Sequence, residues 1–449
     1  MGQSVKGAGG MCVLALALSG CMSDISERYA PADLVSRFRS PDATQAIKPT
    51  YAEKITADSQ IIQGLATRTS VLPADSVAAT VASSVLAANS RTAESEVRAA
   101  TLRSEAASKN WLPKIGPQVS LTSLGSLAAN LVVDQVLFDN GRRAGERAFA
   151  VADVEVAAVS LAQDTNDRVA TALKLYTTAA QARENAALDV VTLKDMTHFE
   201  WVMQERVKGG VSDMSDLTVL RQKLAEIRAR YEASIERDAT SISELNAMSI
   251  TPLGDLRGIP EFQVNAFAAE PLIVVRAQAE KIRAVASAKV NRASFLPGLS
   301  AGGTIGKGSN LGLHVKSDSL LGFGTSASLE AVKMAEETAT RKLRQSTEDA
   351  NRDLRRLEKQ ISAKARQAAE ATTLAAQAKR NLDIFQAQYD AGQRQVMDVV
   401  GVYETYTRQQ QAQVALKYDV VRWRVFRVFL PTGARFDSEV PLHADHHQR

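Results

Sequence analysis

The chain has 449 residues, of which 23% are charged and only 5% are aromatic, and its formal net charge is +4. This weak positive charge, without clusters of Lys and Arg interleaved with aromatics, argues against nucleic-acid binding. Long stretches of Ala, Ser, Thr, Gln, Arg and Glu are typical of long helices that pack through small side chains, and not of ordinary globular domains.

The first 20 residues are predicted to be a signal peptide, because Lys6 precedes a short apolar core at Met11–Leu18. Residues 18–21, Leu-Ser-Gly-Cys, resemble the lipobox of bacterial lipoproteins, in which the thiol of the cysteine, here Cys21, receives a diacylglycerol. In that class Met22 after the cysteine favours the outer membrane. The alternative is an ordinary secretory signal with an incidental cysteine.

The mature chain is expected to have no free thiol. Cys12 leaves with the signal peptide and Cys21 is consumed by lipid, so neither a disulfide nor a cysteine metal site is predicted. After residue 21 no stretch of 18 or more consecutive apolar residues occurs, so a crossing of the membrane would have to use β-strands. Residues 21–72, with Pro31, Pro41 and Pro49, are predicted to be an irregular tether.

The rest of the chain reads as a duplication. Pro113 corresponds to Pro297, an offset of 184 (297 minus 113), and Gly210 corresponds to Gly392, an offset of 182 (392 minus 210). Landmarks that drift by only about two residues over roughly 95 indicate an internal repeat. Segments without glycine or proline, predicted to be helices, lie between Pro73 and Pro113 and at 146–208, 211–251, 272–296, 325–391 and 402–430.

We therefore predict a first repeat at 73–252, a linker at 253–270, a second repeat at 271–433 and a disordered tail at 434–449. The 63-residue segment 146–208 would form a helix of roughly 95 Å. A heptad seam runs along the long helix of the second repeat and is interrupted only at Lys364. Its members are Leu354, Leu357, Ile361, Ala368, Ala371, Ala375, Ala378, Leu382, Phe385 and Tyr389.

Two segments differ from these helices, at 113–140 and 297–330. Each is long enough for a pair of strands of roughly ten residues, the length that crosses a bilayer when tilted. Their alternation of apolar and polar residues is poor, so surface loops remain the alternative.

Four stretches resemble the TolC-like outer-membrane efflux proteins. They are ASKNWLPKIGPQVS, QVLFDNGRRAGERAFA, ASFLPGLSAGG and YDAGQRQVMDVVGVYETYTRQQQAQVALKYD. Each motif alone is weak, but their order and spacing, occurring twice, are specific, and the likeness runs from about Ala74 to Gly433. The resemblance implies a mainly α fold with a small transmembrane β part: a duplicated long-helix α-barrel plus four β-strands per protomer, with a homotrimer forming a 12-stranded barrel and a long periplasmic tunnel.

The resemblance also implies a gate at the periplasmic tip, where Gly210 and Gly392 mark the turns. Asp398 matches an aspartate that rings the constriction, while Arg394 and Asp216 match residues that pair across neighbouring helices and hold the tip shut. Three carboxylates near one axis would repel one another, so some are expected to have a raised pKa. The alternative is that these residues are solvated helix caps.

One position departs from the family pattern. Where relatives can carry a second aspartate, this chain has Gly401, so the constriction here would have one ring of carboxylates instead of two. Asp213, one turn before the first aspartate of the other repeat, is a candidate substitute.

The remaining motifs give little evidence of a function. The tail holds His443, His446 and His447, but no cysteine or carboxylate cluster completes a metal site, so a disordered tail is favoured. The basic aromatic patch at 422–427 could touch anionic headgroups, although packing is the preferred interpretation. No nucleotide-binding, hydrolase or zinc-protease motif occurs, so we predict that the protein is not an enzyme and needs no cofactor.

The sequence thus predicts a lipid-anchored export channel of the bacterial outer membrane. Its expected partners are a periplasmic adaptor (membrane fusion) protein and an inner-membrane RND or ABC transporter, with outer-membrane lipid around it and no nucleic acid. The alternative is a periplasmic coiled-coil structural or tethering lipoprotein without a pore. An adaptor subunit is disfavoured, because no segment is long enough for a lipoyl-like β-domain.

Overall fold

A computed structural model describes residues 51–68, 70, 72–88, 92–123, 126–262, 270–305, 310–317 and 322–429. The predicted signal peptide, Cys21 and the tail at 434–449 lie outside these residues. In chain order the elements are α3 (Tyr51–Asp58), α4 (Gln60–Ala66), α5 (Val77–Ala87), α6 (Thr92–Ser108), β1 (Lys114–Ser123), β2 (Ser126–Phe138), α7 (Arg142–Lys208), α8 (Met214–Ala247), α9 (Leu272–Ser294), β3 (Gly298–Ile305), β4 (Asn310–Lys316), α10 (Thr325–Asp390) and α11 (Val396–Phe429).

Two helices dominate the described chain. Helix α7 has 67 residues and α10 has 66, so each is about 100 Å long. Helix α7 begins four residues earlier than the breaker-free segment predicted, because Gly145 lies inside its first turns against α9. A Cβ on Gly145 would lie 2.9 Å from Cγ2 of Val290, so this glycine permits a close approach of the two helices. None of the described helices has both the length and the apolar character to cross a membrane.

The heptad seam of α10 is confirmed as the side that faces α11 and α9. Leu357, Ala371, Ala375 and Leu382 are buried there, whereas most residues between them are exposed. The one interruption, Lys364, is accommodated by charge, since its Nζ lies 3.4 Å from Oδ2 of Asp419 on α11. Alanines at the seam let the helices approach closely.

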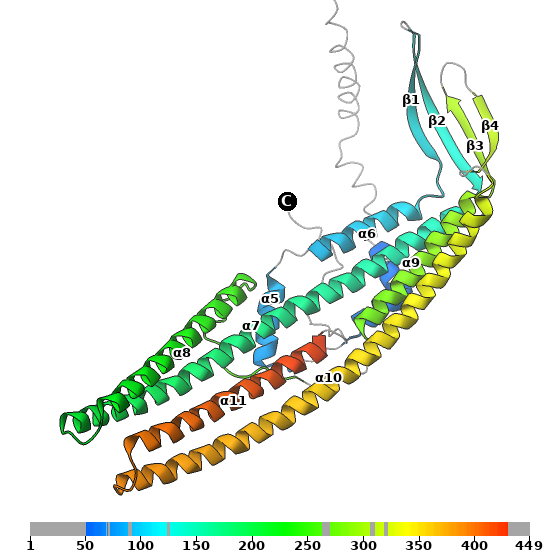
Figure 1. Ribbon diagram of the computed structural model, residues 1–449. Coiled ribbons are helices and arrows are strands. Elements are labelled where there is room, and N and C mark those ends of the chain that lie inside the picture. Colours follow the sequence, from blue (N-terminus) through cyan, green and yellow to red (C-terminus); the bar gives the residue numbers. More distant parts are fainter. Residues whose placement is uncertain are drawn as a thin grey trace, which may run out of the picture. The chain divides into compact units, whose positions relative to one another are not determined.

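The long helix of the first repeat is the more central of the two. Helix α7 contacts α4, α5, α6, α8, α9 and α11, whereas α10 contacts α9 and α11. Figure 1 shows α7 and α10 turning back into α8 and α11 at one end, with the strands at the other. A core around Leu173 and Tyr176 joins α5, α7, α8 and the end of α11, so the two repeats share one interior.

The four strands form one antiparallel sheet in the order β1-β2-β3-β4 (Figure 1). The segments for which surface loops were the alternative are therefore strands. Each repeat supplies one hairpin, and β2 pairs with β3 to join the repeats. Strands β1 and β4 are the edges of this sheet.

Two segments differ from the expectations. The supposed tether, 21–72, contains α3 and α4, which form because Ile55, Ile61 and Ile62 are buried against α6, α7 and α9. The single helix expected before Pro113 is instead two helices, α5 and α6. The linker is held to α7, since the Tyr176 hydroxyl donates to the carbonyl oxygen of Gly258 at 3.0 Å.

Candidate functional site: a two-faced sheet and paired helix turns

The sheet has one apolar face. Residues directly opposite one another in an antiparallel pair lie on the same face. Ile115 lies opposite Val133, which lies opposite Gly303, which lies opposite Leu311. The same register along the strands gives the further members of this face, which are all apolar except Gln135. They are Pro117, Leu131, Ile305, Gln135, Ala301, Leu313, Leu299 and Val315. The side chains of Leu311, Leu313 and Val315 are 85%, 69% and 74% exposed in the single chain.

The opposite face of the sheet is mainly polar. Lys114 lies opposite Asp134, Thr304 opposite Asn310, and the same register brings Ser300, His314 and Lys316 to this side. Val132 and Val136 of β2 are apolar side chains on this face. A sheet that exposes a row of branched apolar side chains on one face and charged or hydroxyl groups on the other separates an apolar medium from water. This division was missed in the sequence, because Gly and Ser interrupt the alternation in β3.

The turns at Gly210 and Gly392 have the same hydrogen-bond pattern. Val211 N donates to Arg206 O at 2.8 Å and Gly210 N to Val207 O at 3.0 Å. The equivalent bonds run from Gln393 and Gly392 to residues 388 and 389, each at 2.8 Å. Both glycines have a positive φ, 71° and 74°. These are two Schellman caps, and they close the long helix of each repeat in the same way.

The predicted gate aspartates hold the same position in the helices that follow. Asp216 is the third residue of α8 and Asp398 the third residue of α11. Asp398 Oδ2 accepts a hydrogen bond from the backbone N–H of Gln395 at 3.2 Å, while Asp213 caps α8 through the N–H of Ser215 at 3.1 Å. A carboxylate here accepts a hydrogen bond from a free backbone N–H and interacts favourably with the positive end of the helix dipole. The capping interpretation thus holds for Asp398, and it leaves the carboxylate exposed.

Arg394 is held within its own turn. Its Nε donates to Oε1 of Gln388 at 3.0 Å, and its guanidinium carbon lies 4.6 Å from the centre of the Phe385 ring. Among the described residues of this single chain, no hydrogen bond or ion pair joins Arg394 to Asp216. The predicted pair across neighbouring helices therefore stays a prediction about contacts between chains.

A shared apolar core supports both turns. It includes Met196, Phe199 and Met203 of α7, Leu217, Leu220, Leu224 and Ile227 of α8, Leu382 of α10, and Val396, Val399, Val400 and Tyr403 of α11. Because side chains from both repeats fill one core, the two turns are held side by side. Gly401 lies on the exposed side of α11, away from this core, with open space around its Cα.

Polar side chains link α7 to α11 next to that core. Asp189 is fully buried and accepts hydrogen bonds from Arg230 of α8 at 2.8 Å and from Gln411 of α11 at 3.1 Å. Further along the same helix pair, Glu184 accepts from Lys417 and from the hydroxyl of Tyr418, both at 2.8 Å. Burial and the neighbouring Glu184 carboxylate raise the pKa of Tyr418. Buried charges are therefore paired, as their desolvation requires.

Two arginines of the basic patch near the end of α11 are packed, as preferred from the sequence, whereas Arg424 is exposed. Arg422 donates to Asp419 at 2.7 Å and to Gln181 of α7 at 2.8 Å, and Arg427 pairs with Glu358 of α10 at 2.6 Å.

No protein-family model matches the sequence, and no match is found among curated proteins. Solved structures do match, and they define the class: the chain has the fold of the TolC-like outer-membrane channels. One is the outer-membrane protein VceC from Vibrio cholerae, 14% identical, with a TM-score of 0.69 over 80% of this chain and 97% of that one.

Two other channels agree with this assignment of the fold. The CmeC outer-membrane channel of Campylobacter jejuni is 14% identical, with a TM-score of 0.64 over 88% of this chain and 94% of that chain. The MtrE outer-membrane channel of Neisseria gonorrhoeae, solved in an open state, is 14% identical, with a TM-score of 0.62 over 80% and 89%. At this identity the likeness establishes the fold.

Proposed function

We propose that the protein is an export channel of the bacterial outer membrane, built as a homotrimer and gated at the helical turns. The observation that carries this proposal is the two-faced sheet. Its apolar face suits lipid and its polar face suits a water-filled passage. The alternative function, a coiled-coil tether without a pore, would not require such a sheet or two matched hairpins.

The edges of the sheet support assembly from several copies. Strands β1 and β4 each leave a row of backbone N–H and C=O groups without a partner strand in the single chain. In lipid every such group must be paired, so four strands alone would be unstable. Three chains that pair β4 of one with β1 of the next would close a sheet of twelve strands with no free edge.

The helices would continue this passage as a tunnel that narrows at the turns. There, three copies of Asp398 would form a ring that attracts cations, and Arg394 of one chain would pair with Asp216 of its neighbour as a latch. The exposure of the Asp398 carboxylate beyond its capping bond supports the ring. A partner that breaks the latch would open the passage.

The channel would carry out no chemistry. Transport would be driven by an inner-membrane RND or ABC transporter and coupled through a periplasmic adaptor, and a diacylglycerol on Cys21 would anchor each chain in the outer membrane. The channel fold and the predicted lipobox support this placement.

The test is the single-channel conductance of the purified full-length protein in a planar bilayer. We expect rare, small, cation-selective openings, from a detergent complex with three times the mass of one chain. Folded and inserted protein that gives no openings at all would contradict the channel and favour the coiled-coil tether. Metabolic labelling with palmitate, compared between the wild type and Cys21→Ser, tests the anchor separately.

A further inference from the structure

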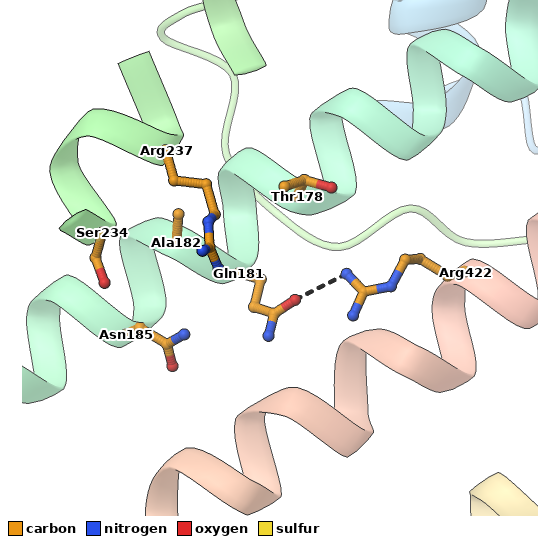
Figure 2. Close-up of a pocket in the computed structure, with 7 residues that line it drawn as sticks. All are labelled: Thr178, Gln181, Ala182, Asn185, Ser234, Arg237 and Arg422. Carbon is orange, nitrogen blue, oxygen red and sulfur yellow. Dashed lines mark hydrogen bonds between the residues drawn. The ribbon is translucent and has the colours of Figure 1, made fainter. Parts of the chain in front are cut away.

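A polar cavity lies where the two repeats meet, between α7, α8 and α11 (Figure 2). Its volume is about 330 Å³. One face of α7 lines it, because Gln181, Ala182 and Asn185 recur at the spacing of helical turns. Helix α8 adds Ser234 and Arg237, three residues apart, and α11 adds the guanidinium of Arg422. We call this cavity the α7–α8–α11 pocket.

Some of the polar groups that line the pocket already have hydrogen-bond partners within the chain. Arg422 donates to the Gln181 amide oxygen at 2.8 Å, the contact drawn in Figure 2, and to the Asp419 carboxylate at 2.7 Å. Asp419 also pairs with Lys364 of α10, so this carboxylate is shared between two cations. Because the oxygen of Gln181 is occupied, its NH₂ group is the part left for a ligand.

Three other lining groups have no such partner. Within the described part of the chain, the exposed Arg237 makes no hydrogen bond or ion pair, so its positive charge has no counter-charge there. The hydroxyl of Ser234 likewise forms no hydrogen bond there. The amide oxygen Oδ1 of Asn185 is buried and has no donor. A buried acceptor without a donor is costly, so this atom points to a missing partner.

These groups define the chemistry of an occupant. The positive charge and the NH₂, OH and guanidinium donors suit an anionic oxygen group, and Asn185 Oδ1 suits an N–H or O–H donor beside it. A planar guanidinium matches a carboxylate by donating two parallel hydrogen bonds.

We propose that the α7–α8–α11 pocket binds a carboxylate that bears a neighbouring N–H or O–H donor. An acidic residue of a polypeptide offers this chemistry through its side chain and backbone amide, and so does a free hydroxycarboxylate. The groups left for a ligand come from α7 and α8, so a bound carboxylate would link these two helices beside Arg422 of α11. The pocket is independent of the channel proposal, because it is complete within one chain.

The experiment is saturation-transfer NMR on the full-length protein in detergent. One probe is N-acetylglutamate N-methylamide, which mimics an acidic residue in a polypeptide, and its neutral control is the glutamine counterpart. The second probe is glycolate, a free hydroxycarboxylate. We expect the glutamate probe to bind at least about tenfold more tightly than the glutamine probe, as for a charge-assisted hydrogen bond. Binding of glycolate alone would identify a small metabolite as the occupant.

Arg237→Gln should weaken carboxylate binding by about tenfold or more, because it removes the uncompensated charge. The matched control is Arg228→Gln, which removes another exposed arginine of α8 outside the pocket and should leave binding unchanged. Both variants alter exposed side chains, and an unchanged helical circular dichroism signal verifies their fold. The proposal is overturned if neither probe binds, if the glutamine probe binds equally well, or if both variants behave alike.

Discussion

The hydroxyl of Tyr403 on α11 donates a 2.6 Å hydrogen bond to Oδ2 of Asp195 on α7, and so joins the two repeats beside the core of the turns. These residues are 208 positions apart in the sequence. Burial, reinforced by the hydrogen bond to Asp195, raises the pKa of Tyr403. The neutral hydroxyl is thus the form that the fold favours.

Tyr403→Phe should lower the free energy of unfolding by about 1.5–3 kcal/mol at neutral pH, because a hydrogen bond to a charged acceptor is lost. The ring and its packing on Phe199 are kept. Urea unfolding followed by circular dichroism measures the change. Tyr231→Phe is the control, since the Tyr231 hydroxyl makes no hydrogen bond within the described residues. Equal losses in both variants would contradict a special role for the Asp195 contact.

The raised pKa values of Tyr403 and Tyr418 predict that the stability of the protein depends on pH. A pKa raised by folding means that the native state keeps its proton longer than the unfolded chain. The stability that Tyr403 and Tyr418 contribute is therefore complete below about pH 10 and is lost as the pH rises toward their raised values. Each group contributes a slope of up to about 1.4 kcal/mol per pH unit. We expect a double Phe variant to lose stability less steeply than the wild type between about pH 10 and 12; parallel curves would refute this.

Substitution of Arg230 should lower the free energy of unfolding more than substitution of Asp189, although the two residues form one ion pair. Arg230→Ala leaves a fully buried carboxylate, for which we expect a loss of about 3–5 kcal/mol in the free energy of unfolding. Asp189→Leu leaves an arginine whose side chain is 39% exposed and can be solvated, so its loss should be smaller. Denaturant titration compares the two. Arg228→Ala, on the same helix, should change stability by less than about 0.5 kcal/mol. The reverse order of losses would show that Asp189 is not buried in solution.

The turn glycines are required for their backbone conformation. No atom lies within 4 Å of a Cβ built on Gly210 or Gly392, so Gly→Ala there introduces strain from the positive φ alone. Each substitution should destabilise the protein by about 1–2 kcal/mol. Gly401→Ala is the matched control, because Gly401 is helical and also has open space, and it should stabilise by about 0.5–1 kcal/mol. Thermal melting that ranked the three variants equally would contradict the caps.

The proposed gate can be separated from helix capping at Asp398. Asp398→Asn keeps an oxygen that can accept from the N–H of Gln395 but removes the charge. We expect it to lower cation selectivity and raise single-channel conductance without a loss of stability. Asp398→Ala should raise conductance and also destabilise α11 by about 0.5–2 kcal/mol. If neither variant changes conductance or selectivity, Asp398 is only a cap.

Arg394 offers a second test of the gate. Arg394→Ala should raise conductance and increase dye leakage into cells, because it removes the proposed pair with Asp216 of the neighbouring chain. Gln388→Ala removes only the hydrogen bond within the turn, and should leave conductance unchanged. Arg408→Ala, an exposed arginine of α11, controls for general loss of positive charge. Equal effects of Arg394→Ala and Arg408→Ala would exclude a latch.

Much of the fold followed from glycine and proline positions. The turns at Gly210 and Gly392 and the seam interrupted at Lys364 were predicted, because breakers and heptads are local signals. The hairpins were implied by the family resemblance, since the residues alone left surface loops open. The two faces of the sheet were not predicted, since they depend on the strand register, which places Leu311 opposite Gly303. Helices α3 and α4 were missed because three prolines precede them, and their apolar residues are buried only by distant partners.

The candidate site shows the same limit. The internal repeat shows in the sequence that an aspartate follows each turn at the same distance. The family resemblance assigned these aspartates to a gate. Capping was one of the two interpretations open for Asp398, and the structure identifies its partner as the backbone N–H of Gln395, the residue before α11. The contacts of Asp195 and Asp189 join residues roughly 200 positions apart, and a single sequence holds no signal for such pairs.

The continuity of α7 has a mechanical consequence. Only three residues separate β2 from α7, and α7 then runs without a proline to the turn at Gly210. Along its 67 residues the single glycine is Gly145, near the start, and α10 has none at all. Neither helix therefore has a proline or a mid-helix glycine at which a sharp kink would form, and each spans about 100 Å between its turn and the strands. If the proposed channel opens at the turns, the movement would be distributed as small rotations along α7 and α10.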